Sequence, residues 1–458
     1  MSTTLTKVVG ITGLLCLGIA LSGFAQSDVL ENYVKSGLDK NLVLQQKNIS
    51  LEQALLSLKS ARGMFLPSVE FSGAYQSGEG GRYIDLPIGD LLNPVYSTLN
   101  QLTASDAFPQ VSNVNQSFFP NNFYDVKLHA VMPLVNTDLI YNRQLQSQKI
   151  TLNEYGVDAY KRELVKEIKV AYFNYLSSLD AVNIYSRALE LAFEGKRVNE
   201  SLLSNGKGLP ASVLRADAEV ESLRAQLNDA EKNSQNARLY FNFLLNADPE
   251  APVDTNYNAA QLMAAIPMLI QQKPASSSRE ELKSLEQVVS LNETVLKMNR
   301  SYSVPQLAAF GDVGFQGDNL QWNDKSDYYF VGLQLSVPLF KGFTNRYKIA
   351  SSKLDKKAAE LQLEDAKNGF RMSLTLAHNR LSSAFASYQA SRRQLSAAES
   401  YHRLVEKGYR EGVFSFIEML DARNQLTTAA VQVNLQQQKV FSAMAMLERE
   451  AASYSLVK

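Results

Sequence analysis

The chain has 458 residues, 45% of them hydrophobic, and its 46 basic residues equal its 46 acidic residues. This balance of charge gives no electrostatic reason to expect binding of nucleic acid or of an anionic membrane surface. Cys16 is the single cysteine, so we expect no disulfide within the chain and no thiolate metal site.

Residues 1–25 have the layout of a secretory signal peptide. Lys7 precedes an apolar run over 8–24, and small residues stand at Gly23 and Ala25. We expect cleavage near Gln26 and export from the cytoplasm. A retained anchor helix is the alternative, although a run of about 17 residues is at the short limit for a membrane span. The later sequence has no comparable apolar run, so we predict no transmembrane helix.

Residues 26–247 are predicted to form a first structural repeat, and residues 277–458 a second. The first repeat comprises a helix at 28–63, strands at 66–76 and 122–134, a long helix at 138–204 and a helix at 211–247. The second comprises a helix at 277–302, strands at 305–316 and 328–339, a long helix at 344–409 and a helix at 414–451. Residues 248–276 form an equatorial linker with an apolar stripe that includes Leu262 and Ile266.

The repeats are aligned by two landmarks at nearly the same offset. Pro133 and Pro338 each end an alternating strand, and Gly206 and Gly412 each follow a long proline-free stretch. A constant offset over two landmarks indicates an internal duplication. Each long stretch would form a rod of roughly 100 Å at 1.5 Å per residue. Its apolar residues recur at heptad-like steps, which predicts sideways packing against other helices.

The four predicted strands alternate between an apolar and a polar face. Val126 and Leu128 share one face of the second strand, whereas Lys127 and His129 share the other. Their length and period are typical of outer-membrane barrel strands. Aromatic residues gather at one end of the strands, as an interfacial girdle would: Tyr75, Phe123, Tyr124, Trp322, Tyr328 and Tyr329.

A soluble sheet with one wet face is the alternative interpretation of these strands. The aromatic residues and the signal peptide favour a membrane barrel instead. Four strands cannot close a barrel, and open edges are not tolerated in lipid, so several chains must contribute to one barrel.

These features together resemble the TolC-like outer-membrane efflux and secretion channels. The most specific stretch is Gly-Tyr-Arg-Glu-Gly-Val-Phe-Ser-Phe-Ile-Glu-Met-Leu-Asp-Ala at 408–422, and the resemblance covers nearly the whole chain after residue 26. It implies an α+β membrane protein, in which a homotrimer makes a 12-stranded outer-membrane barrel continued by a periplasmic tunnel of helices. It also implies a passive exit duct for a tripartite efflux pump or type I secretion system, without a cofactor. The implied partners are a periplasmic adaptor, an inner-membrane transporter and outer-membrane lipid.

The resemblance also assigns roles at the tips of the helices. Relatives carry two acidic residues that ring the closed periplasmic entrance, and here these positions are Glu418 and Asp421. Both lie on one helix face, and three chains would gather six carboxylates that attract cations. The alternative is a pair of solvated carboxylates with no role in gating.

The salt bridge that latches the tips of the best-known members is absent from this sequence. Its two positions read Phe414 and Ser212, while Tyr409 stands at the family's tyrosine position and Gly206 and Gly412 form the turns. We expect Tyr409 to hydrogen-bond to the neighbouring tip. Phe414 is interpreted either as an apolar contact in the latch or with an adaptor, or as a buried packing residue.

The segment 76–122 between the first two strands is longer than the short loop of the best-known members. It contains an apolar stretch at 86–102, which fits either a lid over the barrel mouth or a folded surface loop. An enzyme is not expected, since the sequence lacks HExxH, GxSxG and P-loop motifs. A periplasmic coiled-coil adaptor without a barrel is the alternative function, and the sequence does not specify a cargo.

Overall fold

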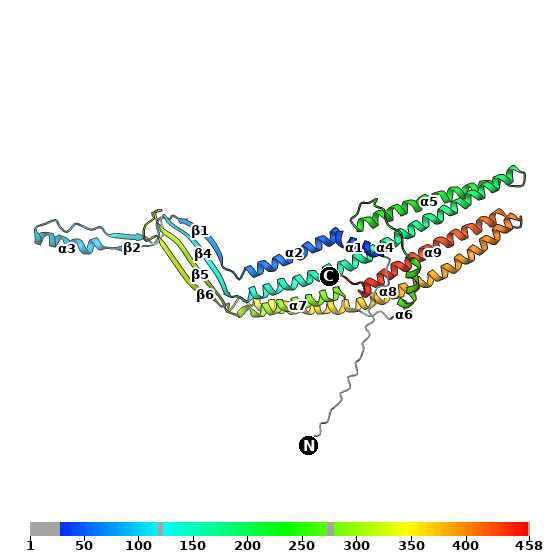
Figure 1. The fold of residues 1–458 in the computed structure, drawn as a ribbon. Coiled ribbons are helices and arrows are strands. Elements are labelled where there is room, and N and C mark those ends of the chain that lie inside the picture. The colour runs from blue at the N-terminus through cyan, green and yellow to red at the C-terminus, as the bar shows by residue number, and fades with distance from the viewer. Residues whose placement is uncertain (1–27, 118–121, 273–278, 457–458) are drawn as a thin grey trace, which may run out of the picture. The chain divides into compact units, whose positions relative to one another are not determined.

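The computed structural model describes residues 28–117, 122–272 and 279–456 (Figure 1). The predicted signal peptide at 1–25 therefore lies outside the described residues. The chain forms two compact units. Of the described residues, the helical unit comprises 28–52, 150–272, 279–289 and 358–456, and the sheet unit comprises 53–117, 122–149 and 290–357. Within the described ranges, no helix is both long enough and apolar enough to cross a membrane.

The sheet unit contains a four-stranded antiparallel sheet with the order β1-β4-β5-β6 (Figure 1). Its strands are β1 (Ser68–Gln76), β4 (Phe123–Val135), β5 (Gln306–Asp318) and β6 (Asp327–Ser336). Leu128 of β4 pairs with Phe71 of β1 and with Val313 of β5, and Val313 pairs with Tyr329 of β6. Because side chains alternate along a strand, this register gives one continuous apolar face. Among the described strands, β1 and β6 each have one neighbour, so each leaves one edge unpaired.

The opposite face of the sheet carries a polar cluster. Lys127 Nζ lies 3.7 Å from Asp125 Oδ2 and 4.0 Å from Asp312 Oδ2. His129 Nδ1 is hydrogen-bonded to Asp312 Oδ1, and the hydroxyl of Tyr328 donates to Asp125 Oδ1 at 2.7 Å. The sequence placed His129 on this polar face, and here it has a carboxylate partner.

The predicted aromatic girdle needs a correction at two of its six positions. Tyr328 bonds to Asp125, and Phe123 has the same parity along β4 as Asp125, so both lie on the polar face. Alternation along the strands makes it impossible for them to share a face with Tyr124 and Tyr329. Of the other four positions, Tyr75, Tyr124 and Tyr329 share the apolar face, but Tyr124 is buried and its hydroxyl donates to Gln321 O at 2.8 Å. The centroid of the Trp322 ring lies 4.2 Å from that of Phe315.

The other elements of the sheet unit form an insertion between β1 and β4. It consists of β2 (Tyr83–Leu86), α3 (Ile88–Thr103) and β3 (Val114–Ser117), and β2 pairs antiparallel with β3. The segment predicted as one long loop thus contains its own helix.

The remaining elements are mainly helices. They are α1 (Asp28–Lys40), α2 (Leu42–Gly63), α4 (Thr137–Ser204), α5 (Pro210–Leu244), α6 (Ala259–Gln271), α7 (Glu280–Arg300), η1 (Ser301–Ser303), α8 (Thr344–Arg410) and α9 (Phe416–Ala451). Figure 1 shows α5 returning beside α4 and α9 beside α8. Buried alanines allow this close packing: Ala188 and Ala192 of α4 meet Val220 of α5, and Val405 of α8 meets Ala422 of α9.

Three predicted boundaries differ from the structure for local reasons. The single helix predicted at 28–63 divides at Asn41, whose Oδ1 accepts from Leu44 N at 3.0 Å and so caps α2. Helix α5 ends at Leu244 rather than at residue 247, because Asn246 adopts a left-handed conformation with φ 50°. Strand β6 ends at Ser336 rather than at 339, and Pro338 just beyond it cannot donate a ladder hydrogen bond.

Helix α6 of the linker connects two hydrophobic clusters of the helical unit. Leu262 packs into the cluster that contains Tyr172 of α4 and Phe241 of α5, whereas Ile266 packs into the cluster that contains Leu381 of α8. Both linker residues are buried. The apolar stripe predicted for residues 248–276 therefore packs onto the long helices.

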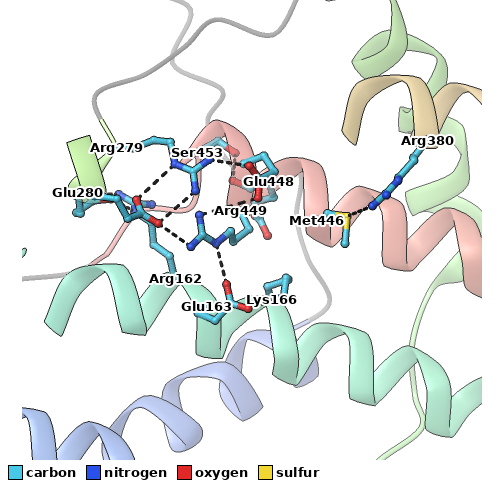
Figure 2. Close-up of polar contacts among 12 residues, drawn as sticks. Arg162, Glu163, Lys166, Arg279, Glu280, Arg380, Met446, Glu448, Arg449 and Ser453 are labelled. Atoms are coloured by element: carbon cyan, nitrogen blue, oxygen red, sulfur yellow. Dashed lines mark hydrogen bonds and ion pairs between the residues drawn. The ribbon is translucent and has the colours of Figure 1, made fainter. Parts of the chain in front are cut away.

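A charged cluster joins α4 to the start of α7 and the end of α9 (Figure 2). Arg162 forms a bidentate pair with Glu280, at 2.6 Å and 2.9 Å, and Arg449 donates to Glu163 and Glu281. Burial acts to raise the pKa of Glu280, but the hydrogen bonds from Arg162 and from its own backbone outweigh it, so the pKa is lowered. Such reciprocal pairing satisfies charges that would be costly to bury alone.

Candidate functional site

The tips of the two helical hairpins end in the same turn. After α4, Gly206 has φ 68°, and the N–H of Lys207 donates to Leu202 O at 2.9 Å. After α8, Gly412 has φ 77°, and the N–H of Val413 donates to Gly408 O at 2.7 Å. Each is a Schellman motif, which requires a left-handed residue and favours glycine. The glycine breaks predicted from the sequence correspond to these turns.

The helices that follow the two turns begin differently. Helix α5 starts with Pro210 after Leu209, which has no side chain able to cap it. Helix α9 starts with a capping box, in which Ser415 Oγ accepts from Glu418 N and the Glu418 carboxylate accepts from Ser415 N at 2.7 Å. The second tip therefore holds one of its carboxylates in a fixed orientation.

Glu418 and Asp421 are both exposed on the first turns of α9. Hydrogen bonds from the backbone and side chain of Ser415 lower the pKa of Glu418. Asp421 Oδ2 accepts from Gln425 Nε2 at 2.7 Å. One chain thus presents two solvated carboxylates three residues apart, and a ring of them needs further copies of the chain.

Phe414 packs within its own hairpin. A Cβ placed on Gly408 would lie 2.4 Å from Phe414 Cδ2, so glycine at 408 makes room for this ring. Phe414 packs against the small apolar cluster of the second tip, which consists of Val405, Met419 and Ala422. The ring is half-buried, so both interpretations from the sequence, an apolar contact of the latch or adaptor and a packing residue, stay open.

The two tips are joined by Arg423. Near this contact, burial raises the pKa of Tyr409, and the side chain of Asn199 on α4 acts in the opposite sense. Arg423 Nη1 donates to Leu191 O of α4 at 2.6 Å. For Ser212, the structure records among the described residues only a backbone hydrogen bond, to Leu209 O. Neither Ser212 nor Phe414 supplies this connection between the tips.

The surroundings of Arg423 disfavour its charge and leave part of its hydrogen-bonding capacity unused. Burial lowers its pKa, although nearby acidic groups such as Glu406 and Glu194 act in the opposite direction. Its Nε is buried and has no hydrogen-bond partner in the described part of the chain. A Cβ on Gly195 would lie 2.4 Å from Arg423 Nη1, so Gly195 provides the space that the guanidinium occupies.

His402 lies in the same region and is also buried. Burial lowers its pKa, with Arg423 acting in the same sense and Glu406 opposing. Its Nε2 has no partner among the residues that the structure describes. The tip therefore contains two basic side chains whose charged forms are disfavoured by their surroundings.

Sequence reasoning missed Arg423, Asn199 and Gly195. One signal was present, because an isolated glycine inside a long helical pattern usually has a packing reason. Gly195 lies inside α4 and was not singled out. Arg423 stands two residues beyond the acidic signature, and nothing in its local sequence indicates a partner on another helix.

The polar groups of the second tip include the exposed carboxylates of Glu418 and Asp421, the half-buried Arg423 and the buried His402. Over the described ranges, no group of three His, Cys, Asp or Glu residues could hold a metal ion.

Comparison with known proteins relates this architecture to a family. Residues 272–451 match the family described as "Outer membrane efflux protein". The chain is 22% identical over 389 residues to the alkaline protease secretion protein AprF of Pseudomonas aeruginosa, covering 82% of this chain and 80% of that protein. It is 20% identical over 440 residues to the outer membrane protein TolC of Escherichia coli K12, covering 91% and 81%.

A solved structure has the same fold. The Campylobacter jejuni CmeC outer membrane channel superimposes with a TM-score of 0.71 at 16% identity, covering 93% of this chain and 86% of that one. Sequence and fold agree over most of the chain. Residues 272–451 thus match the outer membrane efflux protein family, and over most of its length the chain is similar in sequence and fold to TolC-like outer-membrane proteins.

Proposed function

We propose that the chain is one protomer of a homotrimeric exit duct in the outer membrane. Three copies contribute four strands each to a 12-stranded barrel, and their helices continue it as a periplasmic tunnel. The duct passively conducts cargo delivered by a periplasmic adaptor and an inner-membrane transporter, in an efflux pump or type I secretion system. A cleaved signal peptide at residues 1–25 exports the chain.

The main support is the four-stranded sheet, which is incomplete in a single chain. One face is a continuous apolar surface, with Val331, Leu333 and Leu335 of β6 each at least 65% exposed. The edges of β1 and β6 are unpaired among the described residues. Lipid would cover such a face, and pairing β1 of one copy with β6 of the next would satisfy the edges. The polar cluster around Lys127 and Asp312 would then line the lumen.

The proposed duplication is supported by matching parts in the two halves. Residues 26–247 supply the β1–β4 pair and the turn at Gly206, and residues 277–458 supply the β5–β6 pair and the turn at Gly412. Residues 248–276 are the equatorial linker, with 273–276 outside the described residues.

Two neighbouring residues on opposite faces of β6 test the barrel. Leu333→Arg places a charge on the proposed lipid face, which costs about 2–4 kcal/mol near the bilayer midplane. The matched control, Gln334→Arg, places the same charge on the lumen face. We expect the control to appear as a heat-resistant trimer in detergent-extracted outer membrane, and Leu333→Arg to be depleted there. Equal yields, or a soluble periplasmic monomer for the wild type, would support an adaptor instead.

We also propose that Glu418 and Asp421 of three copies ring the entrance and favour cations. A double Glu418→Ala, Asp421→Ala variant is expected to lose cation preference and divalent block in single-channel recordings. The control removes two exposed acids of α5, with Asp229→Ala and Glu231→Ala, and should keep both properties. Unchanged selectivity in the first variant would assign the two residues to ordinary solvated positions.

A further inference from the structure

In the insertion between β1 and β4, one face of helix α3 is attached to the rest of the insertion. Asn93 of α3 exchanges two hydrogen bonds with the backbone of Val111, at 2.9 Å and 2.8 Å. Asn100 exchanges two with Phe108, at 2.8 Å and 3.0 Å. These side-chain-to-backbone bonds attach one face of α3 to the returning segment at 108–111. The positions 88, 92, 95, 99 and 102 lie about 100° or more around the helix axis from this attachment, on an adjacent face.

This adjacent face is an apolar seam with the spacing of a coiled coil, exposed at Ile88, Val95 and Leu102 and half-buried at the two members between them. Its members, at alternating steps of four and three residues, are Ile88, Leu92, Val95, Leu99 and Leu102. Val95 is 52% exposed and Leu102 is 78% exposed. This spacing keeps apolar residues on one side of a helix, where they can interlock with the seam of another helix. Pro94 lies away from the seam.

The position of the insertion in the sheet would bring the α3 helices of neighbouring copies to the same end of the barrel. The insertion leaves the sheet after Gln76 and returns at Phe123, and these two residues pair with each other at one end of the sheet. In the trimer proposed above, on which this inference rests, three copies of α3 therefore emerge at the same end of the barrel. The two glycines before β2, Gly80 and Gly81, have φ 86° and 88° and allow a turn that other residues rarely adopt.

The distances allow the three helices to meet. A twelve-stranded barrel with strands about 4.8 Å apart and tilted by about 40° has a radius of roughly 12 Å. Helices packed about 9 Å apart in a threefold bundle have axes roughly 5 Å from its centre. Each α3 must therefore move inward by roughly 7 Å. The connecting residues 77–82 can span about 20 Å when extended, which is ample.

The charge of the insertion argues against a membrane surface as the binding partner of the seam. Between residues 77 and 122 the only basic residue is Arg82, against the four acidic residues Glu79, Asp85, Asp90 and Asp106. A net negative segment is repelled by anionic lipid headgroups. None of these charges lies on the seam, so a second copy of the same helix meets an uncharged apolar surface.

We propose that α3 of the three protomers forms a parallel three-helix bundle that caps the outer mouth of the channel. The occupant of each seam is thus the seam of a neighbouring copy. The threefold symmetry of the barrel sets the number of helices, because a mixed Ile, Val and Leu seam does not by itself select three. Tethering to one barrel supplies an effective concentration in the millimolar range, which favours even a short bundle.

Single cysteines on opposite sides of α3 test this cap. Val95→Cys lies on the seam, and Ser97→Cys is the matched control on the exposed opposite side. Both are made in a Cys16→Ser background, so that each chain contains one thiol. Under mild oxidation of intact cells, Val95→Cys should form disulfide-linked dimers of the chain and Ser97→Cys should not. A bulky maleimide added outside should label Val95→Cys about tenfold or more slowly than Ser97→Cys.

The outcomes separate this inference from the proposed function. If the protein is a heat-resistant trimer but both cysteines react equally fast and neither cross-links, the cap is wrong and the trimer stands. If Val95→Cys cross-links to a different protein, the seam serves another partner and the cap is again wrong. If native mass shows a monomer, the proposed function itself fails. Val95→Asp with Leu102→Asp should keep the trimer and increase channel conductance, and an unchanged conductance would overturn the capping role.

Discussion

Gly195 offers the sharpest test of how the two tips are held together. It faces Arg423, whose Nη1 donates to Leu191 O at 2.6 Å, and a Cβ at 195 would lie 2.4 Å from that nitrogen. Gly195→Ala therefore forces the end of a flexible side chain to move. The backbone of α4 can remain helical, while the contact between the hairpins is lost or lengthened.

The expected weakening of the contact between the tips follows from two opposing effects. A hydrogen bond from a charged group contributes about 1.5–3 kcal/mol, and renewed hydration of the displaced guanidinium returns part of this. We therefore expect the contact between the tips to weaken by about 1–2 kcal/mol, or roughly five- to thirtyfold in the opening equilibrium. Alanine also favours the helix over glycine by about 1 kcal/mol, but α4 is helical whether the tips are joined or apart, so this gain cancels.

Hydrogen exchange of the tip peptides measures this opening directly. Gly195→Ala should accelerate exchange around residues 405–424, and the frequency of channel opening in planar bilayers should rise with it. The control is Gly156→Ala in the same helix, where a Cβ would meet no atom of the described chain within 4 Å. It shares the gain in helix propensity and leaves the tip untouched. If both variants exchange at the wild-type rate, Arg423 does not hold the tips together.

Three further predictions concern buried and capping groups. The side chain of Lys169 is fully buried, and its Nζ lies 2.6 Å from Glu448, whose side chain is 25% exposed. Lys169→Met should therefore destabilise the fold by about 1–3 kcal/mol in thermal unfolding, because it leaves the Glu448 carboxylate without this partner. Adding Glu448→Gln should restore much of the lost stability. Burial and the nearby Arg423 lower the pKa of His402 against the opposing effect of Glu406, so His402 binds its proton at a higher pH in the unfolded chain than in the folded one. Stability should therefore fall as pH drops below about 6.5, less so in His402→Gln. Ser415→Ala should return the pKa of Glu418 toward its usual value, so that the share of the cation preference due to Glu418 is lost in bilayer recordings at a higher pH than in the wild type, with Ser212→Ala as control.

The parts of the fold that the sequence predicts well are those determined by local periodicity. Leu128 and Lys127 occupy opposite faces because alternation is a property of any strand, and the register preserves it across all four strands. Gly206 and Gly412 predict turns because a left-handed residue is needed to end each helix. Neither inference requires knowledge of a distant partner.

The parts that the sequence does not predict depend on such partners. Asn41 interrupts the first helix, and its Nδ2 donates to Leu244 O far along the chain. Arg162 and Glu280 pair across more than a hundred residues, and no periodic pattern indicates which charges will meet. The girdle prediction was wrong at Phe123 and Tyr328 because clustering along the chain does not distinguish faces, and Tyr328 differs from Tyr329 by one step of the strand.

The different starts of α5 and α9 bear on how an entrance made from these tips would act on ions. The Glu418 carboxylate already accepts two hydrogen bonds from Ser415, at 2.7 Å and 2.8 Å, and it lies at the positive end of the helix. Part of its field is therefore compensated within its own chain. Asp421 lies one turn further on, and within the described part of the chain its carboxylate has only a neutral amide as hydrogen-bond partner. In any ring formed by several copies, Asp421 should therefore contribute more of the attraction for cations, while Glu418 chiefly fixes the start of α9 and so the direction in which Asp421 points.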